Sequence, residues 1–157
     1  MDWVESAGGP LVVMRKENSL DWGGVDTDDY DEACGVSDFA GVISREWGDV
    51  LVLGDEPLRT SVIHRGDGVA LVRWGAAPDE DCLIKVALGV DLSSMVPSEI
   101  LKPVHLNGTL VVFDAGAPGG DARRLEFTLT SRVGVVRTYV VNDAEKDVQL
   151  ILHQLGG

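Results

Sequence analysis

The stretches LEFTL (residues 125–129) and VQLILHQL (residues 148–155) decide the fold class. In both, apolar side chains recur at every second position, which is the period of a β-strand. The second stretch could also belong to a helix that begins near Asp143, because Glu145, Lys146 and Asp147 would suit a first turn. We expect a strand, since the apolar spacing fits a period of two better than one of about 3.6 and Gly157 follows soon after.

Short runs of the same kind recur along most of the chain, at intervals of about 8–12 residues. We predict strands at residues 11–14, 40–44, 49–53, 60–65, 69–74, 82–88, 109–113, 125–130, 133–141 and 148–155. The turn sequences Gly66-Asp67-Gly68 and Asn107-Gly108 are typical of hairpins, and the second is the stronger signal. The sequence GAPGG at residues 116–120 predicts a mobile turn between two strands.

Helix signals are few. The best is TDDYDEAC at residues 27–34, where Thr27 or Asp26 would cap the N-terminus and the acids would favour the positive end of the helix. Residues 93–101 carry a weaker signal. These features predict an α+β fold that is predominantly antiparallel β, as a bent sheet or a partly open barrel with one or two short helices. The length predicts a single domain over residues 1–157.

The charge balance narrows the choice of partner. The chain has 26 acidic and 13 basic residues, a net charge of −13. Binding to nucleic acid or to a membrane surface depends on Lys and Arg, so neither is expected, whereas a basic protein would be attracted. No run of about 18 apolar residues occurs, and the N-terminal sequence lacks the basic region of a secretory signal. We therefore expect a cytoplasmic protein.

The most unusual feature is a cluster of eight acids without a single base between Glu17 and Asp38. We predict that this segment docks a basic partner, with aromatic anchors among the acids. The candidate partner-binding residues are Trp22, Asp26, Asp28, Asp29, Tyr30, Asp31 and Glu32. Two alternatives stay open: the acids are only a solvated loop and helix start, and Trp22, like the other tryptophans that precede glycine, chiefly packs the core.

Metal and catalytic signatures are weak. A calcium loop beginning at Asp26 would need glycine at position 31 and glutamate at position 37, where the chain has Asp31 and Ser37. A looser carboxylate site for a hard cation stays open. His64, His105 and His153 are isolated, and the chain has no nucleophile elbow, phosphate-binding loop or dinucleotide motif.

The cysteines add no site either. Cys34 and Cys82 lie far apart outside any CxxC pattern, so we expect two buried, reduced thiols. No cofactor and no enzymatic activity are expected.

Four blocks of sequence carry a family resemblance: WVESAGGPLVVM (residues 3–14), DWGG (21–24), DYDEAC (29–34) and LGDEP (53–57). In this order, and with the late pattern from Tyr139 to His153, they resemble the immunity protein 21 family of bacterial polymorphic toxin systems. The resemblance implies a non-enzymatic cytoplasmic protein that binds and neutralises a toxin encoded beside it. It assigns no interface residues.

The toxin itself is not identified by the resemblance. A basic nuclease would fit, because an acidic surface can cover the groove in which phosphates would sit. Two other hypotheses stay open: a small β-rich module that binds a ligand or joins a larger assembly, and an enzyme with an unrecognised site at the carboxylates of residues 26–32. The oligomeric state is not predicted.

Overall fold

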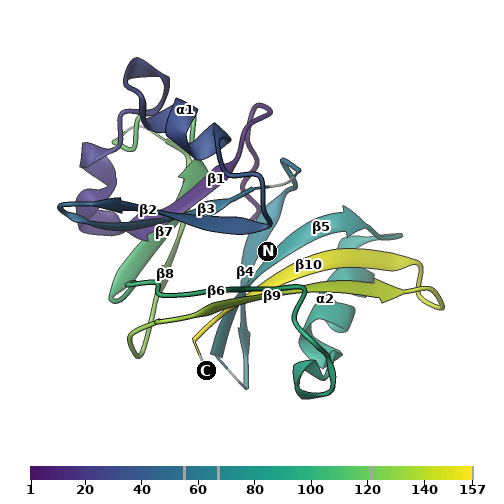
Figure 1. Cartoon of the computed structure of the whole chain (residues 1–157). Coiled ribbons are helices and arrows are strands. Elements are labelled where there is room, and N and C mark those ends of the chain that lie inside the picture. Colours follow the sequence, from purple (N-terminus) through teal and green to yellow (C-terminus); the bar gives the residue numbers. More distant parts are fainter. Residues whose placement is uncertain (55, 67, 121, 157) are drawn as a thin grey trace.

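The computed structural model describes residues 1–54, 56–66, 68–120 and 122–156, and in these residues ten strands form two five-stranded sheets (Figure 1). Sheet 1 has the order β2 (Ala40–Arg45), β3 (Gly48–Leu53), β1 (Leu11–Arg15), β7 (Thr109–Asp114) and β8 (Arg124–Thr128). Sheet 2 has the order β4 (Thr60–Arg65), β5 (Gly68–Ala76), β10 (Val148–Leu155), β9 (Val136–Asp143) and β6 (Glu99–Leu101). All neighbouring strands are antiparallel. The predicted β-rich α+β class is confirmed, and its sheet is divided into two.

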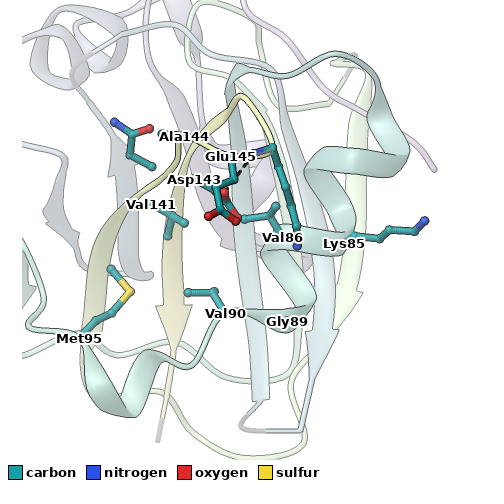
Figure 2. Close-up of a pocket in the computed structure, with 11 residues that line it drawn as sticks. Lys85, Val86, Gly89, Val90, Met95, Val141, Asp143, Ala144 and Glu145 are labelled. Atoms are coloured by element: carbon teal, nitrogen blue, oxygen red, sulfur yellow. Dashed lines mark hydrogen bonds between the residues drawn. The ribbon is translucent and has the colours of Figure 1, made fainter.

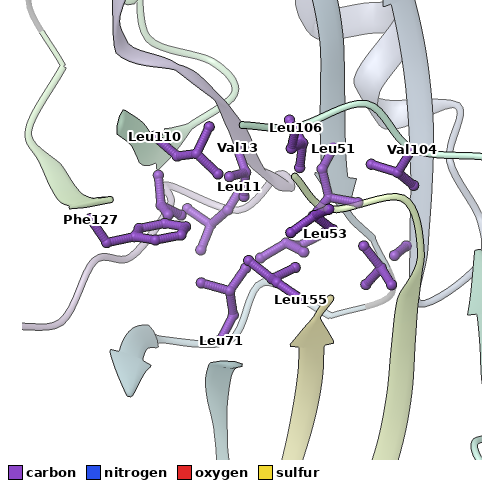
Figure 3. Close-up of a cluster of buried hydrophobic side chains, with 14 of the residues drawn as sticks. Leu11, Val13, Leu51, Leu53, Leu71, Val104, Leu106, Leu110, Phe127 and Leu155 are labelled. Atoms are coloured by element: carbon purple, nitrogen blue, oxygen red, sulfur yellow. The ribbon is translucent and has the colours of Figure 1, made fainter. Parts of the chain in front are cut away.

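The two sheets pack face to face around one hydrophobic cluster (Figure 3). Leu11 and Leu53 of sheet 1 meet Leu71 and Leu155 of sheet 2, and each of these side chains is buried. Apolar surface removed from water in this way is the main stabilising contribution to such a fold.

The outer faces of both sheets are covered as well, so the molecule has four layers. Segments η1 (Lys16–Asp21), η2 (Gly24–Asp26) and α1 (Asp29–Cys34) cover sheet 1, whereas α2 (Glu80–Gly89) and η3 (Leu92–Ser94) cover sheet 2 (Figure 1). Strands buried on both faces need apolar residues at every position. This explains the unbroken run Leu11-Val12-Val13-Met14, in which every residue is fully buried.

The strand predicted at residues 82–88 is wrong, because this segment forms helix α2. The Asp79 side chain caps the helix by accepting a hydrogen bond from the Cys82 backbone N–H at 2.8 Å. Leu83, Val86 and Ala87 then lie on one face, at helical spacing, and pack on the outer face of sheet 2. The apolar run fits the period of a strand as well as that of a helix. The Asp79 cap, and the outer face of sheet 2 that needs an apolar cover, favour the helix.

Two further expectations are wrong. The weak helix signal at residues 93–101 corresponds to the end of η3 and to edge strand β6, which pairs with β9. Asn107-Gly108 does not close a hairpin: it precedes β7 of sheet 1, whereas the preceding strand β6 belongs to sheet 2. The turn therefore carries the chain from one sheet to the other. Residues 66 and 68 flank the β4–β5 connection as predicted, while Asp67 lies outside the described residues.

The remaining predicted strands are confirmed with shifts of a few residues at their ends, and residues 148–155 form a strand and not a helix. The predicted helix at residues 27–34 is confirmed as the shorter α1. Its N-cap is Asp28, whose side chain makes no capping bond, and the Thr27 Oγ1 accepts from the Asp29 N–H at 3.2 Å. None of the described helices has the length and apolar character that crossing a membrane requires.

Candidate interaction surface

The acid-rich segment is the cover of sheet 1, and its backbone is held closely to the sheet. The Gly23–Val25 stretch lies against the loop after β7, with the Val25 N–H bonded to the Gly116 carbonyl at 3.1 Å. Gly24 has φ +58°, and a Cβ at this position would lie 2.5 Å from the Gly116 oxygen. Only glycine fits this approach, which explains the second glycine of the Trp-Gly-Gly sequence.

Trp22 fixes the segment from the inside. Its side chain is 1% exposed, packs with Val12, Met14 and Phe113, and donates from Nε1 to the Ala115 carbonyl at 2.9 Å. The indole therefore offers no surface to a partner in this conformation. Trp22 therefore packs the core, which was the alternative interpretation of its sequence context. The candidate surface is left with Asp26, Asp28, Asp29, Tyr30, Asp31 and Glu32.

The side chains of helix α1 lie on two faces, one toward the protein and one toward solvent. Asp29, Tyr30 and Ala33 lie toward the protein, whereas Asp28, Asp31 and Glu32 are exposed. Positions three and four residues apart share one face of a helix, so these three carboxylates lie together. We call Asp28, Asp31 and Glu32, with the nearby exposed Asp26, the acidic surface.

Asp29 differs from its acidic neighbours, because it is tied into the fold. Its Oδ2 accepts from the Gly23 N–H at 2.9 Å, and its Oδ1 accepts from the Arg45 guanidinium of β2 at 2.8 Å. Burial opposes ionisation of this carboxyl, but the hydrogen bonds from Gly23, Arg45 and Thr27 outweigh it and hold its pKa below the usual value. Asp29 is thus a structural anchor and not a free charge.

Arg45 also reaches Glu32, at 3.0 Å, and the hydrogen bond to Asp29 raises the arginine's pKa. One cation therefore serves two carboxylates. Among the described residues, no ion pair involves Asp26, Asp28 or Asp31. Within the acidic surface, Glu32 shares Arg45 with Asp29, whereas the charges of Asp26, Asp28 and Asp31 have no such counter-charge in the part of the chain that the structure describes.

Tyr30 is half-buried and stands where several distant segments meet. A Cβ on Gly9 would lie 2.5 Å from its hydroxyl oxygen, and a Cβ on Gly116 would lie 3.5 Å from its ring. One hollow beside the ring is lined by Gly8, Gly9, Pro10, Cys34, Val36 and Gly54. The blocks at residues 3–14, 29–34 and 53–57 therefore converge on this tyrosine, although Asp55 of the last block lies outside the described residues.

The hydroxyl of Tyr30 has Cys34 as a neighbour. The neighbouring Cys34 side chain, with burial and the negative charge of Asp114 and Asp31, raises the pKa of Tyr30. The phenol is therefore neutral at physiological pH and can donate a hydrogen bond.

A second hollow of about 290 Å³ adjoins the ring on the side of Asp114, at the end of β7. Its lining includes Ala7, Val25 and Ala117. Asp114 is a residue that sequence alone does not single out, since one acid after an apolar strand carries no pattern. Only the fold brings it next to Tyr30, 84 positions earlier in the numbering.

The other candidate groups do not form a site. Both cysteines are free, but Cys34 is exposed and Cys82 is half-buried, so the expectation of two buried thiols is wrong. Each sits on a helix face that does not point fully into the core. Among the described residues, no three side chains of His, Cys, Asp or Glu are placed to share a metal ion.

The histidines are separated in space as in sequence. His64 and His105 are exposed, whereas His153 is buried between the sheets, with Nδ1 2.8 Å from the Thr138 hydroxyl. Burial, with the nearby charge of Arg73, lowers the pKa of His153 to about 3. This imidazole is neutral at physiological pH and belongs to the core.

A separate groove of about 450 Å³ lies at the other end of the molecule, between the end of α2 and the β9–β10 turn (Figure 2). Val86, Val90, Met95 and Val141 form its apolar part. Its rim carries both signs of charge, from Lys85 and Lys146 and from Asp143 and Glu145. It is a mixed surface, in contrast to the acidic surface over α1.

The described residues thus form a two-sheet α+β scaffold whose outer helical cover presents carboxylates to solvent. The family model Immunity protein 21 matches residues 2–147 of the chain. The chain therefore belongs to the immunity protein 21 family, which confirms the family resemblance and implies a toxin-neutralising role. No curated protein and no solved structure matches the chain.

Proposed function

We propose that this chain is the cytoplasmic immunity protein of a polymorphic toxin system, and that it binds its cognate toxin domain through the acidic surface and occludes the toxin's active site. It acts by binding and not by catalysis, as one unit over residues 1–157. A toxin with a basic active-site groove, such as a nuclease, fits this surface.

One observation carries the proposal: α1 is fixed to sheet 1 on one face, and its other face displays Asp28 and Asp31, which have no ion pair among the described residues. Because the backbone is already held by Trp22, Gly24 and the Asp29–Arg45 pair, little ordering free energy is lost on binding. A surface of one sign also accelerates encounter with a partner of the opposite sign.

The first test is co-expression with the toxin encoded beside this chain's gene. Survival of the cells, together with a purified complex of the two proteins, is the expected result. Cells that die although the protein is abundant and folded, with no complex in solution, would contradict the proposal.

The second test addresses the acidic surface. The double variant Asp28→Lys with Asp31→Lys should lower the association rate about 10-fold at low salt and flatten its dependence on ionic strength. The matched control is Asp81→Lys with Glu145→Lys, which makes the same charge change at exposed positions on the α2 side. Equal association rates for the two double variants would show that the acidic surface does not guide docking and serves solubility only.

The groove of Figure 2 supports a second candidate function, a small ligand-binding or assembly module. Its volume and apolar walls suit part of a small molecule or a side chain of another protein. Met95→Trp, which narrows the groove, should leave toxin binding unchanged under the main proposal. Loss of toxin binding in this variant would move the interface to the groove.

A further inference from the structure

The hollow between Tyr30 and Asp114 has a chemical character that the acidic surface lacks. Its walls are apolar or backbone, from Ala7, Val25, Gly116 and Ala117, and a carboxylate is part of its lining. Val25 is 64% exposed beside it, which is an unusual position for a valine on a charged surface. Apolar walls around one charge suit a long side chain with a charged end.

The carboxylate of Asp114 is held in place by the backbone. Its Oδ2 accepts from the Ala7 N–H at 3.0 Å and its Oδ1 accepts from the Gly116 N–H at 2.9 Å. These bonds hold both oxygens in one orientation, and a carboxylate has lone pairs for further donors. Among the described residues, Asp114 has no ion pair with a lysine or arginine.

The ring of Tyr30 forms another wall of the hollow, and aromatic rings attract cations placed over their faces. Asp31 and Asp114 both act on the Tyr30 hydroxyl electrostatically, so their charge reaches this point. The hollow therefore combines a fixed carboxylate, an aromatic ring and apolar walls, next to the acidic surface.

We propose that this hollow is a socket for one lysine or arginine side chain of the toxin. The stem of the side chain packs against Val25, Ala117 and Tyr30, and its charged end pairs with Asp114. This inference rests on the proposed function and deepens it, because it separates a long-range role of the acidic surface from a contact role of the socket.

The test compares binding kinetics of the purified full-length protein with the toxin domain encoded beside its gene. Asp114→Asn removes the charge and should weaken binding by about 30-fold or more, mainly through faster dissociation, since the bound toxin would cover the pair. Ala117→Leu fills the hollow without changing the charge and should also accelerate dissociation. The matched control is Asp49→Asn, another half-buried carboxylate that accepts from a backbone N–H, that of His105 at 2.8 Å.

The outcomes separate the socket from the proposed function. If the unaltered protein binds the toxin but Asp114→Asn and Ala117→Leu bind equally well, the socket is overturned and the function stands. If both variants lower only the association rate, Asp114 acts as part of the acidic surface, and the socket is again overturned. If the unaltered protein does not bind the toxin, both are overturned. Ala117→Leu decides the matter if Asp114→Asn fails to fold.

Discussion

The two outer layers of the molecule cover their sheets in different ways. Over sheet 2 lies a regular, capped helix of ten residues, α2, which buries one apolar face. Over sheet 1 lies an irregular segment with two short 3-10 turns and the six-residue α1. Helix α2 is held by an apolar face whose residues recur at helical spacing. The cover of sheet 1 is held by a few individual contacts, such as those of Trp22 and Asp29, and its other acidic side chains face solvent.

This difference shows how a binding surface can be built without a long helix. A helix of six residues is not stable on its own, so α1 exists because the protein holds it in place. Trp22, Gly24 and Asp29 provide that hold, whereas the exposed carboxylates of Asp28 and Asp31 have no ion pair among the described residues. Substitutions can therefore break the cover of sheet 1 at a few positions, whereas α2 depends on the packing of one apolar face.

The largest expected effect is that of Trp22→Ala. Removing this fully buried indole leaves a cavity on sheet 1 and an unpaired Ala115 carbonyl, and should lower the free energy of unfolding by about 3–5 kcal/mol. Leu83→Ala is the counterpart on α2 and should cost about 2–5 kcal/mol. Urea denaturation measures both. A Trp22→Ala protein as stable as the unaltered one would show that the indole does not hold the cover.

The next prediction is that a glycine-to-alanine substitution lowers stability in the cover of sheet 1 and raises it at the end of α2. Gly24→Ala places a Cβ at positive φ, 2.5 Å from the Gly116 oxygen, and should cost about 1–3 kcal/mol. Gly89→Ala at the end of α2 meets no atom within 4 Å and should raise stability by about 0.5 kcal/mol, because it restricts the unfolded chain. Thermal unfolding gives both values. Equal shifts in the same direction would contradict the contrast.

The same contrast explains what could be predicted from the sequence. Local periodicity predicts strands such as residues 60–65 and 148–155, including their first and last residues. The identity of α2 depends on a cap at Asp79 and on a sheet face that needs a cover, and local periodicity contains neither. The exposure of Asp28 and Asp31 can be expected from the sequence, because charged side chains in an acid-rich segment face solvent. The burial of Trp22, the Asp29–Arg45 pair and the position of Asp114 depend on contacts between distant segments, which one sequence does not reveal.

A smaller effect compares the N-caps of the two helices. Asp79 caps α2 through the Cys82 N–H, so Asp79→Ala should cost about 1 kcal/mol. Asp28 is the N-cap residue of α1 but makes no side-chain capping bond, so Asp28→Ala should change stability by less than about 0.5 kcal/mol. Urea denaturation distinguishes these cases. A cost at Asp28 equal to that at Asp79 would mean that this carboxylate serves folding after all.

The smallest effect concerns the pH dependence that Asp29 gives to the cover of sheet 1. Its pKa is lowered below 3.8 in the folded protein, so its stabilising contribution is fully present above that value and is lost as the pH falls through the lowered pKa. Asp29→Asn should therefore be about 0.5–1 kcal/mol less stable than the unaltered protein at pH 6, and this difference should shrink toward pH 2. Subtracting the two stability curves removes the contribution of His153, which titrates in both proteins. A difference that stays constant from pH 6 to pH 2 would show that Asp29 holds the cover of sheet 1 through its shape and hydrogen bonds and not through its charge.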